Sequence, residues 1–192
     1  HYKTTGTAMK ESALSDRWES KGSKVAVVSK KKAENEDYPD AKEVLLVNNT
    51  KNKVLVSQKV FDQAYPASTT KLMTAILTLE NCQLTDTVTV NPDALKGIPA
   101  TYTTAALQPN EQLTVDQLLH VILIPSANDA ANVLAYHVAG SIENFAVMMN
   151  AKAKEIGCKN THFVNPSGVH NDEHYSTAYD MALIGKFANT FD

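Results

Sequence analysis

The stretch Tyr65-Pro-Ala-Ser-Thr-Thr-Lys-Leu-Met-Thr74 begins the first segment of the chain with helical periodicity. Ser68 lies in the first turn of this predicted helix, and Lys71 follows three residues later. Positions three apart share a helical face, with Cβ atoms about 5–6 Å apart. The two side chains are therefore expected to lie side by side. The apolar residues that follow recur at helical spacing and extend the predicted helix to about Glu80: Leu72, Ala75, Ile76 and Leu79.

The Ser68–Lys71 pair suits nucleophilic catalysis. A serine hydroxyl attacks poorly until a base removes its proton. A helix N-terminus favours a developing alkoxide and disfavours an ammonium group, and burial also lowers a lysine pKa. Both effects favour a neutral Lys71 that accepts the proton of Ser68. The alternative is a helix cap and a surface charge, because the same Ser-x-x-Lys pattern recurs at 29–32 within a charged run.

A second polar motif, Ile124-Pro-Ser-Ala-Asn-Asp129, lies between two predicted helices. Ser126 could pass a proton from the lysine to a leaving amine, and Asn128 could hold a substrate amide. An ordinary helix N-cap would explain the same residues, since such caps are common. The two motifs together favour a catalytic site that neither motif indicates alone.

The rest of the pattern predicts a mixed α/β (α+β) chain. Two β-branched runs, 44–47 and 54–57, flank five polar residues and predict an antiparallel hairpin. A short strand is expected at 86–90. Capping residues and terminal glycines predict four further helices, which run from Thr114 to near Pro125, 129–139, 141–156 and 177–190.

Composition narrows the classes of function. The chain has 192 residues, of which 43% are hydrophobic and 20% charged, with a net charge of −3. This length suits one large domain, and the charge excludes a typical nucleic-acid binder. Residues 1–42 contain 16 of the 39 charged residues, which predicts a solvated, mobile arm before a domain at 43–192. No run of eighteen apolar residues is present, so no membrane span is expected.

Cysteines and histidines indicate neither a disulfide scaffold nor a metal site. Cys82 and Cys158 are too few for such a scaffold and lack metal-ligand spacing, so free thiols and a single bridge remain open. His170 and His174 have two acidic residues between them. A helical pair of ligands is not expected at this place, because Gly168 precedes the two histidines, and no metal is predicted.

The segments 66–74 and 125–131 together resemble the low-molecular-mass penicillin-binding proteins, which are serine D-Ala-D-Ala carboxypeptidases. The likeness spans roughly residues 41–190, in the family's order, through four more segments: 150–154, 160–168, 174–178 and 180–182. It implies a penicillin-binding/β-lactamase-like transpeptidase fold. The chain would contain mainly the helical lobe of that fold, with an N-terminal β-hairpin of an incomplete antiparallel sheet.

The resemblance also implies roles for individual residues. Ser68 would be the nucleophile, acylated by the penultimate D-alanine of a peptidoglycan stem peptide, and its backbone N–H would form half of the oxyanion hole. Lys71 would be the general base, Ser126 the proton relay, and Asn128 a binder of the substrate amide. No cofactor or metal is required. β-Lactam antibiotics would be acylating inhibitors, and the protein would act outside the cytoplasmic membrane, in the bacterial cell envelope.

The family's third motif is absent from these residues. No Lys-[Ser/Thr]-Gly, which in the family binds the terminal carboxylate of the substrate, occurs in the sequence. We therefore expect residues 43–192 to be a truncated catalytic domain and the chain to be inactive or nearly so. The export signal would not be in this chain, and a membrane anchor could lie only in a missing C-terminal part.

Two alternatives remain from the sequence. A serine β-lactamase shares the fold and the first two motifs, but the Glu-x-x-Leu-Asn stretch of the commonest class is not present. That absence favours the carboxypeptidase. The second alternative is a non-catalytic fragment or half-domain completed by another chain, which the missing third motif supports.

Overall fold

The computed structural model describes residues 40–191, so almost all of the predicted N-terminal arm lies outside it. The described chain begins with the hairpin of β1 (Val44–Asn48) and β2 (Lys53–Gln58). The two strands are antiparallel, and the register shifts by one residue between Leu46 and Val47. The predicted hairpin is thus confirmed, with a bulge that the sequence pattern did not indicate.

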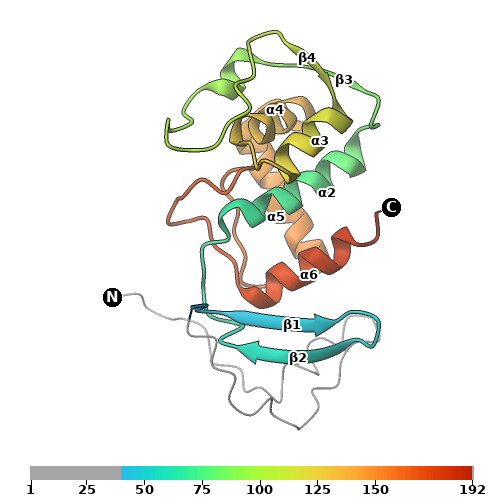
Figure 1. Ribbon diagram of the computed structural model, residues 1–192, viewed down its shortest axis with the longest axis vertical. Coiled ribbons are helices and arrows are strands. Elements are labelled where there is room, and N and C mark those ends of the chain that lie inside the picture. Colours follow the sequence, from blue (N-terminus) through green and yellow to red (C-terminus); the bar gives the residue numbers. More distant parts are fainter. Residues whose placement is uncertain (1–39, 192) are drawn as a thin grey trace.

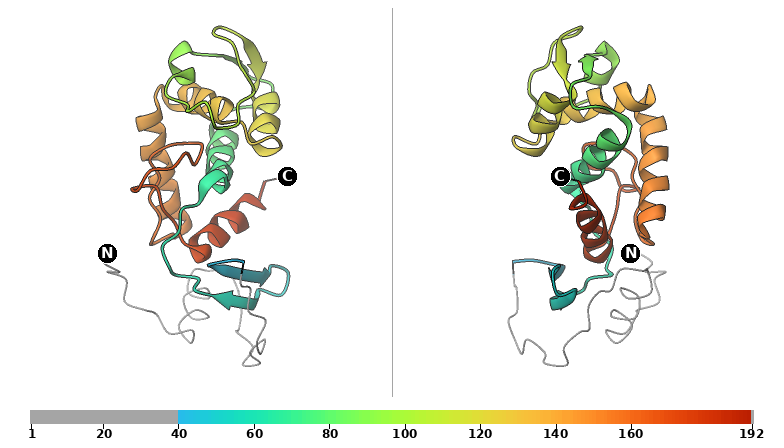
Figure 2. Two further views of the ribbon diagram at one scale, coloured as in Figure 1. Left: turned by 60° about the vertical axis from the view of Figure 1, so that its left-hand side comes forward. Right: turned by 90° about the vertical axis from the view of Figure 1, so that its right-hand side faces the viewer.

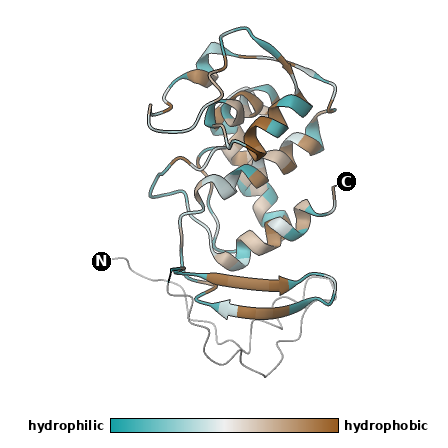
Figure 3. Cartoon of the chain, viewed as in Figure 1, coloured by the Kyte–Doolittle hydropathy of each residue, from teal (hydrophilic) through white to brown (hydrophobic). Residues whose placement is uncertain are grey.

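The hairpin lies at one end of the molecule, against the last helix, α6 (Ala178–Ala188) (Figure 1). Both strands are hydrophobic along most of their length (Figure 3). One cluster buries Val54, Val60 and Tyr179, and further apolar side chains of the hairpin and α6 pack around it. The hairpin is therefore attached to the helical part of the molecule by an apolar contact with α6.

Four other α-helices make up most of the remaining part of residues 40–191. A 3-10 helix, η1 (Ala67–Thr70), leads directly into α2 (Lys71–Asn81). Three more follow later in the chain: α3 (Val115–Leu123), α4 (Asn128–Ala139) and α5 (Ile142–Ile156). The sequence predicts one helix from Ser68 onward, whereas the structure places Ser68 in the tighter 3-10 turn that precedes α2.

The helices begin and end at the capping residues from which their boundaries were predicted. The side chain of Thr114 accepts from the backbone of Gln117 in a full capping box at the start of α3. The side chains of Ser141 and Thr177 each accept one backbone N–H at the starts of α5 and α6. Gly140 and Gly157 end α4 and α5 in the left-handed conformation that glycine adopts at little cost. The local signals in the sequence therefore placed these helix ends correctly.

Helix α2 is central and packs against α3, α4, α5 and α6 (Figure 2). Seven of its eleven residues are buried. Its side chains contribute to two apolar clusters, one shared mainly with α3 and α4, the other with α5 and α6. Because Lys71 is the first residue of this central helix, its side chain starts next to the protein interior.

A small second sheet covers α3 and α4. It pairs β3 (Thr87–Thr89) with β4 (Gln112–Thr114), and η2 (Pro92–Leu95) follows β3. The sequence predicts β3 but not β4, which is only three residues long and merges into the capping box of α3. None of the helices within residues 40–191 is long and apolar enough to cross a bilayer.

Both cysteines lie in the described part of the chain, and they do not form a disulfide. Cys82 packs against the cluster shared with α3 and α4, whereas Cys158 packs against the one shared with α5 and α6. The structure therefore decides the alternative that the sequence left open, because each thiol belongs to a different part of the core.

Candidate active site

The 3-10 turn presents Ser68 to solvent and directs Lys71 into the protein. Ser68 is exposed, whereas Lys71 is only 1% exposed. The Nζ atom of Lys71 lies 3.4 Å from the Oγ atom of Ser68. Ala67, the preceding residue, has a φ of 46°, an unfavourable backbone angle for a residue with a Cβ. The structure thus brings together the two residues that the sequence paired.

Neither of the non-catalytic alternatives for this pair holds. Pro66 is the N-cap of the 3-10 helix, Thr70 is the N-cap of α2, and no side chain caps either helix. Ser68 therefore does not serve as a helix cap. Lys71 is among the largest fully buried side chains of the described chain, so it is not a surface charge.

Two fixed acceptors hold the amine of Lys71. Its Nζ donates to Oδ1 of Asn128 at 2.9 Å and to the carbonyl oxygen of Ser167 at 2.7 Å. A neutral amine has two N–H groups and one lone pair. When these two acceptors take both N–H groups, the lone pair is left for the Ser68 hydroxyl. Burial lowers the pKa of Lys71 to about 8, so about a tenth of the amine is neutral at pH 7 and about half at pH 8.

Asn128 is the first residue of α4, and its amide is almost fully engaged. It is 4% exposed, accepts from Lys71, and donates from Nδ2 to the carbonyl oxygen of Thr103 at 2.9 Å. Its backbone N–H donates to the same carbonyl. Asn128 therefore links the lysine to the loop around Thr103. Binding of a substrate amide by Asn128 stays a prediction.

Asp129 fixes this loop from the next position in α4. The carboxylate is 3% exposed and accepts from the backbone N–H groups of Ala105, Leu107 and Ala130 at 2.9 to 3.1 Å. Backbone donors that lie away from water need such partners. The loop that carries Tyr102 and Thr103 is thus anchored to the same helix turn as Asn128.

Ser126 lies two residues before Asn128 in a strained backbone. Its φ is 63°, in the left-handed region that few residues other than glycine adopt. Its Oγ atom is buried and has no hydrogen-bond partner among the described residues, so it contacts neither Ser68 nor Lys71 in this way. The N-cap of α4 is Ala127, without a side-chain cap, so the helix-cap interpretation of Ser126 is wrong. Its role as a proton relay stays a prediction.

The turn at 165–168 supplies a part of the site that sequence reasoning missed. Asn165 Oδ1 accepts from the backbone N–H groups of Ser167 and Gly168, and this turn directs the Ser167 carbonyl at Lys71. Gly168 has a φ of 83°, and a Cβ there would lie 1.8 Å from the carbonyl oxygen of Ala67. Only glycine permits this approach. An Asn-Pro-Ser-Gly stretch is typical of a turn, but nothing in its sequence indicates contact with the serine.

Polar side chains from three helices, two of them fully buried, hold the segment that carries this turn. The amide of Asn150 on α5 donates to and accepts from the backbone of Phe163, both at 2.8 Å. Thr74 on α2 donates to the carbonyl oxygen of Pro166 at 2.6 Å. The buried carboxylate of Asp180 on α6 accepts from residues 159–161. Three helices therefore fix the position of this segment relative to Lys71.

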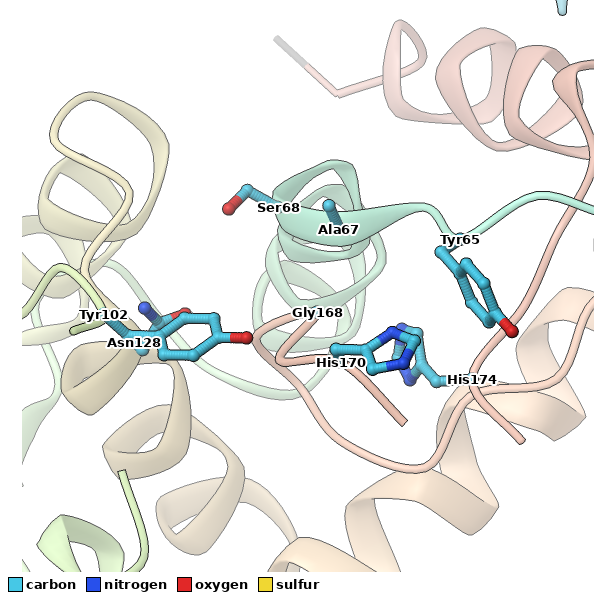
Figure 4. A pocket seen from close by; sticks show the side chains of 8 residues that line it. All are labelled: Tyr65, Ala67, Ser68, Tyr102, Asn128, Gly168, His170 and His174. Atoms are coloured by element: carbon cyan, nitrogen blue, oxygen red, sulfur yellow. The ribbon is translucent and has the colours of Figure 1, made fainter. Parts of the chain in front are cut away.

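A pocket of about 150 Å³ opens beside Ser68 (Figure 4). Tyr102 and Asn128 stand on one side of it, and Tyr65 and His170 on the other, with Gly168 between them. The rings of Tyr65 and His170 meet edge to face at 4.7 Å between centroids. The remaining lining residues are Ala67, Ser68 and His174. The exposed serine hydroxyl therefore adjoins a small pocket with partly aromatic walls.

The two histidines considered as metal ligands have different surroundings. His170 is largely exposed at the pocket, 3.5 Å from the exposed carboxylate of Asp172. His174 is 2% exposed and bonds with both ring nitrogens to protein groups. Within residues 40–191, no three side chains of the kinds that bind metals gather in one place.

Solved structures define the class to which this fold and site belong. The chain aligns with penicillin binding protein 5 from Haemophilus influenzae at a TM-score of 0.72 and 32% identity, over 78% of this chain and 45% of that one. It also aligns with a D-alanyl-D-alanine carboxypeptidase from Mycobacterium tuberculosis at a TM-score of 0.71 and 30% identity. That alignment covers 78% of this chain and 56% of the other. The fold is that of the penicillin-binding proteins, which confirms the expected fold class.

Within that class, the chain belongs to the D-alanyl-D-alanine carboxypeptidase family, whose model matches residues 30–190. It is 39% identical over 153 residues to DacF of Bacillus subtilis and 39% identical over 155 residues to DacC of Escherichia coli. Both are named D-alanyl-D-alanine carboxypeptidases, and 77% of this chain is covered in each case. The chain spans 38% and 39% of the length of these two relatives.

Proposed function

We propose that this chain carries the nucleophilic part of a serine D-Ala-D-Ala carboxypeptidase, which removes the terminal D-alanine from peptidoglycan stem peptides. Membership of the family and the names of the relatives support this assignment. The observation that carries it is the geometry of Lys71. Its amine is buried, bonded to Asn128 and Ser167, and 3.4 Å from the exposed hydroxyl of Ser68.

Acylation begins when neutral Lys71 takes the proton of Ser68. The Oγ atom then bonds to the carbonyl carbon of the penultimate D-alanine, and the carbonyl π electrons move to the oxygen. The backbone N–H of Ser68 stabilises this oxyanion, because N–H groups in a first helical turn have no partner within the helix. Collapse of the intermediate re-forms the carbonyl and breaks the C–N bond to the terminal D-alanine.

The leaving amine needs a proton, which Lys71 now carries. We propose that Ser126 passes it on, accepting from the lysine while donating its own proton to the amine. Its buried Oγ atom supports this role, because it has no partner among the described residues that would compete. Water then attacks the ester carbon, and proton transfer back to Ser68 Oγ restores the hydroxyl. The products are D-alanine and a shortened peptide.

The same chemistry makes β-lactam antibiotics acylating inhibitors, because opening of their ring leaves an ester on Ser68 with no amine to depart. The neighbours named penicillin binding proteins support this expectation. Because such stem peptides lie in the cell wall, we also propose that the protein acts outside the cytoplasmic membrane, in the cell envelope. Neither acylation step, as written above, calls for a metal ion or an organic cofactor.

Covalent labelling tests the proposal most directly. The protein is incubated with a penicillin and examined by mass spectrometry of the intact chain and of the peptide that contains Ser68. We expect one adduct that maps to Ser68 and is absent from Ser68→Ala, while Ser167→Ala keeps it because Lys71 uses the Ser167 backbone. Rapid hydrolysis of the penicillin without an adduct would favour the β-lactamase alternative.

Release of D-alanine is measured on the 192-residue chain and on the protein as its gene encodes it. Because these 192 residues lack a Lys-[Ser/Thr]-Gly motif, we expect release by the chain alone to be very slow. Absence of both labelling and release in every form would favour the other alternative, a non-catalytic fragment or half-domain completed by another chain.

A further inference from the structure

His174 makes two buried hydrogen bonds at the back of the pocket. It is 2% exposed. Its Nε2 atom lies 2.8 Å from Oγ1 of Thr70, and its Nδ1 atom lies 3.1 Å from the backbone nitrogen of Val164. The mechanism above does not use this side chain, although it lines the same pocket as Ser68 (Figure 4).

These partners define the protonation state of the ring. A backbone N–H can only donate, so Nδ1 of His174 accepts from Val164 and carries no proton. The proton of the neutral ring is then on Nε2, which donates to the Thr70 hydroxyl. A doubly protonated ring would direct Nδ1–H at the N–H of Val164 and lose that bond. The site therefore requires neutral His174.

Thr70 is placed to transmit this contact to the catalytic pair. It lies between Ser68 and Lys71, is fully buried, and forms the N-cap of α2. A threonine at an N-cap ordinarily uses its hydroxyl to accept a backbone N–H of the helix. No such bond exists here. The hydroxyl bonds instead to His174, which lies 104 positions later in the chain.

The second bond of His174 leads to the other side of the lysine. Val164 is three residues before Ser167, whose carbonyl accepts from Lys71. The imidazole thus bridges the turn that holds Ser68 and Lys71 to the segment that holds the acceptor of Lys71. We propose that His174 is a positioning residue for acylation, setting the distance between these two parts of the site. This inference rests on the proposed function.

The proposal is tested with two substitutions at one position. Gln can donate and accept from the two atoms of one amide, as the neutral ring does, whereas Leu fills similar space and can do neither. We expect His174→Leu to lower the acylation rate constant of Ser68 by about 10- to 100-fold. The dissociation constant of the unreacted β-lactam should stay within about threefold, because the pocket walls remain. We expect His174→Gln to restore most of the rate.

Thr70→Val removes the other partner and provides a double-mutant cycle. If the two side chains act through one contact, combining Thr70→Val with His174→Leu should slow acylation no further than either change alone. His120→Gln, at an exposed position on α3, is the control and should leave the rate unchanged. If His174→Leu does not fold, the other two variants still test the proposal. It then requires slower acylation in Thr70→Val and a rate close to that of the unaltered protein in His174→Gln.

A readout that does not depend on activity separates this proposal from the proposed function. Nitrogen NMR of the histidine rings should show His174 protonated on Nε2 only, and carbon NMR of the Lys71 Cε should show its pKa changed in His174→Leu but not in His174→Gln. If Ser68 is never acylated, these signals still test the positioning. The proposal is wrong if His174→Leu acylates and titrates like the unaltered chain, or if Gln is as harmful as Leu.

Discussion

The Nζ atom of Lys71 lies 2.7 Å from the carbonyl oxygen of Ser167, and this hydrogen bond joins positions 96 residues apart. One helical turn further along α2, Thr74 donates to the carbonyl oxygen of Pro166. The first turns of α2 therefore contact a single stretch of backbone. Because a carbonyl group is present at every position, the acceptor that this stretch offers to Lys71 is set by how the stretch is folded, which Asn165 and Gly168 determine.

The pKa of Lys71 predicts how acylation depends on pH. Burial lowers this pKa from 10.5 to about 8, and only the neutral amine can accept the Ser68 proton. The acylation rate should therefore rise about tenfold per pH unit below pH 8 and level off above it. The measurement is the rate of β-lactam labelling of Ser68 between pH 6 and 9.5. A rate that does not change across this range would show that Lys71 is not the base.

The close approach of Gly168 to Ala67 predicts a large effect of one added methyl group. Gly168→Ala places a Cβ against the Ala67 carbonyl, and its φ of 83° also disfavours alanine. We expect the free energy of unfolding to fall by roughly 2–4 kcal/mol. Denaturant unfolding measures this loss, and labelling of Ser68 should slow as well, because the displaced atoms belong to the serine turn.

Gly140 provides the matched control for that substitution. Its φ of 78° is similar, but no atom lies within 4 Å of the position of an added Cβ. Gly140→Ala therefore has the backbone strain without the collision, and it should cost only about 1 kcal/mol. Equal losses for the two variants would mean that backbone strain alone, and not contact with the serine turn, accounts for the glycine at 168.

Asp129 is predicted to matter through the loop that it anchors. Asp129→Asn replaces one acceptor oxygen with an NH₂ group that faces backbone donors, so the loop around Thr103 should loosen. We expect a loss of about 2 kcal/mol in the free energy of unfolding, because buried backbone donors lose their partner. Labelling of Ser68 should also slow, since Asn128 bonds to the same loop.

The control for this change is Asp93→Asn, which removes an exposed carboxylate of η2 that is bonded to exposed Lys96. Exposed ion pairs contribute little to stability, so both unfolding and labelling should stay as in the unaltered chain. A similar loss in both variants would point to a general effect of charge rather than to the loop.

His174 predicts a loss of stability in acid. Burial, with a smaller contribution from nearby His162, lowers its pKa from 6.5 to about 4. The unfolded chain thus takes up a proton between pH 6.5 and 4, while the folded chain does not. The contribution of neutral His174 to the free energy of unfolding is therefore complete above pH 6.5. As the pH falls to 4, the protein loses this contribution, which is on the order of 3 kcal/mol. Denaturant unfolding at several pH values, with His174→Gln for comparison, measures this; equal slopes would contradict it.

Local patterns carried most of the fold prediction. The hairpin, the capping box at Thr114 and the terminal Gly140 and Gly157 each depend on neighbours within a few positions, so each could be inferred without the rest of the chain. The same holds for Ser68 and Lys71, whose spacing already places them on one face of a helix. The strand β4 could not be predicted, because three residues are too few to show the alternation of apolar and polar side chains that is typical of a strand.

The contacts that complete the site could not be predicted in this way. Ser167 accepts from Lys71 through its backbone carbonyl, which every residue has, so no residue type marks this contact. The approach of Gly168 to Ala67 brings together two turns that are far apart in the sequence. The spacing of His174 from its neighbours in sequence gives no sign of its structural role, because its partner Thr70 lies 104 positions earlier. Such pairings become visible only after the chain has folded.

The order of synthesis gives these distant contacts a consequence. A ribosome makes Ser68 and Lys71 well before Gly168 and His174, and because a domain generally folds as a unit, the contacts between the two segments form only after the later one has been made. Until the later segment arrives, the lysine is hydrated and charged and lacks its acceptor at Ser167. An unfinished or unfolded chain therefore carries an ordinary, unreactive serine, and reactivity toward acylating agents reports that folding is complete.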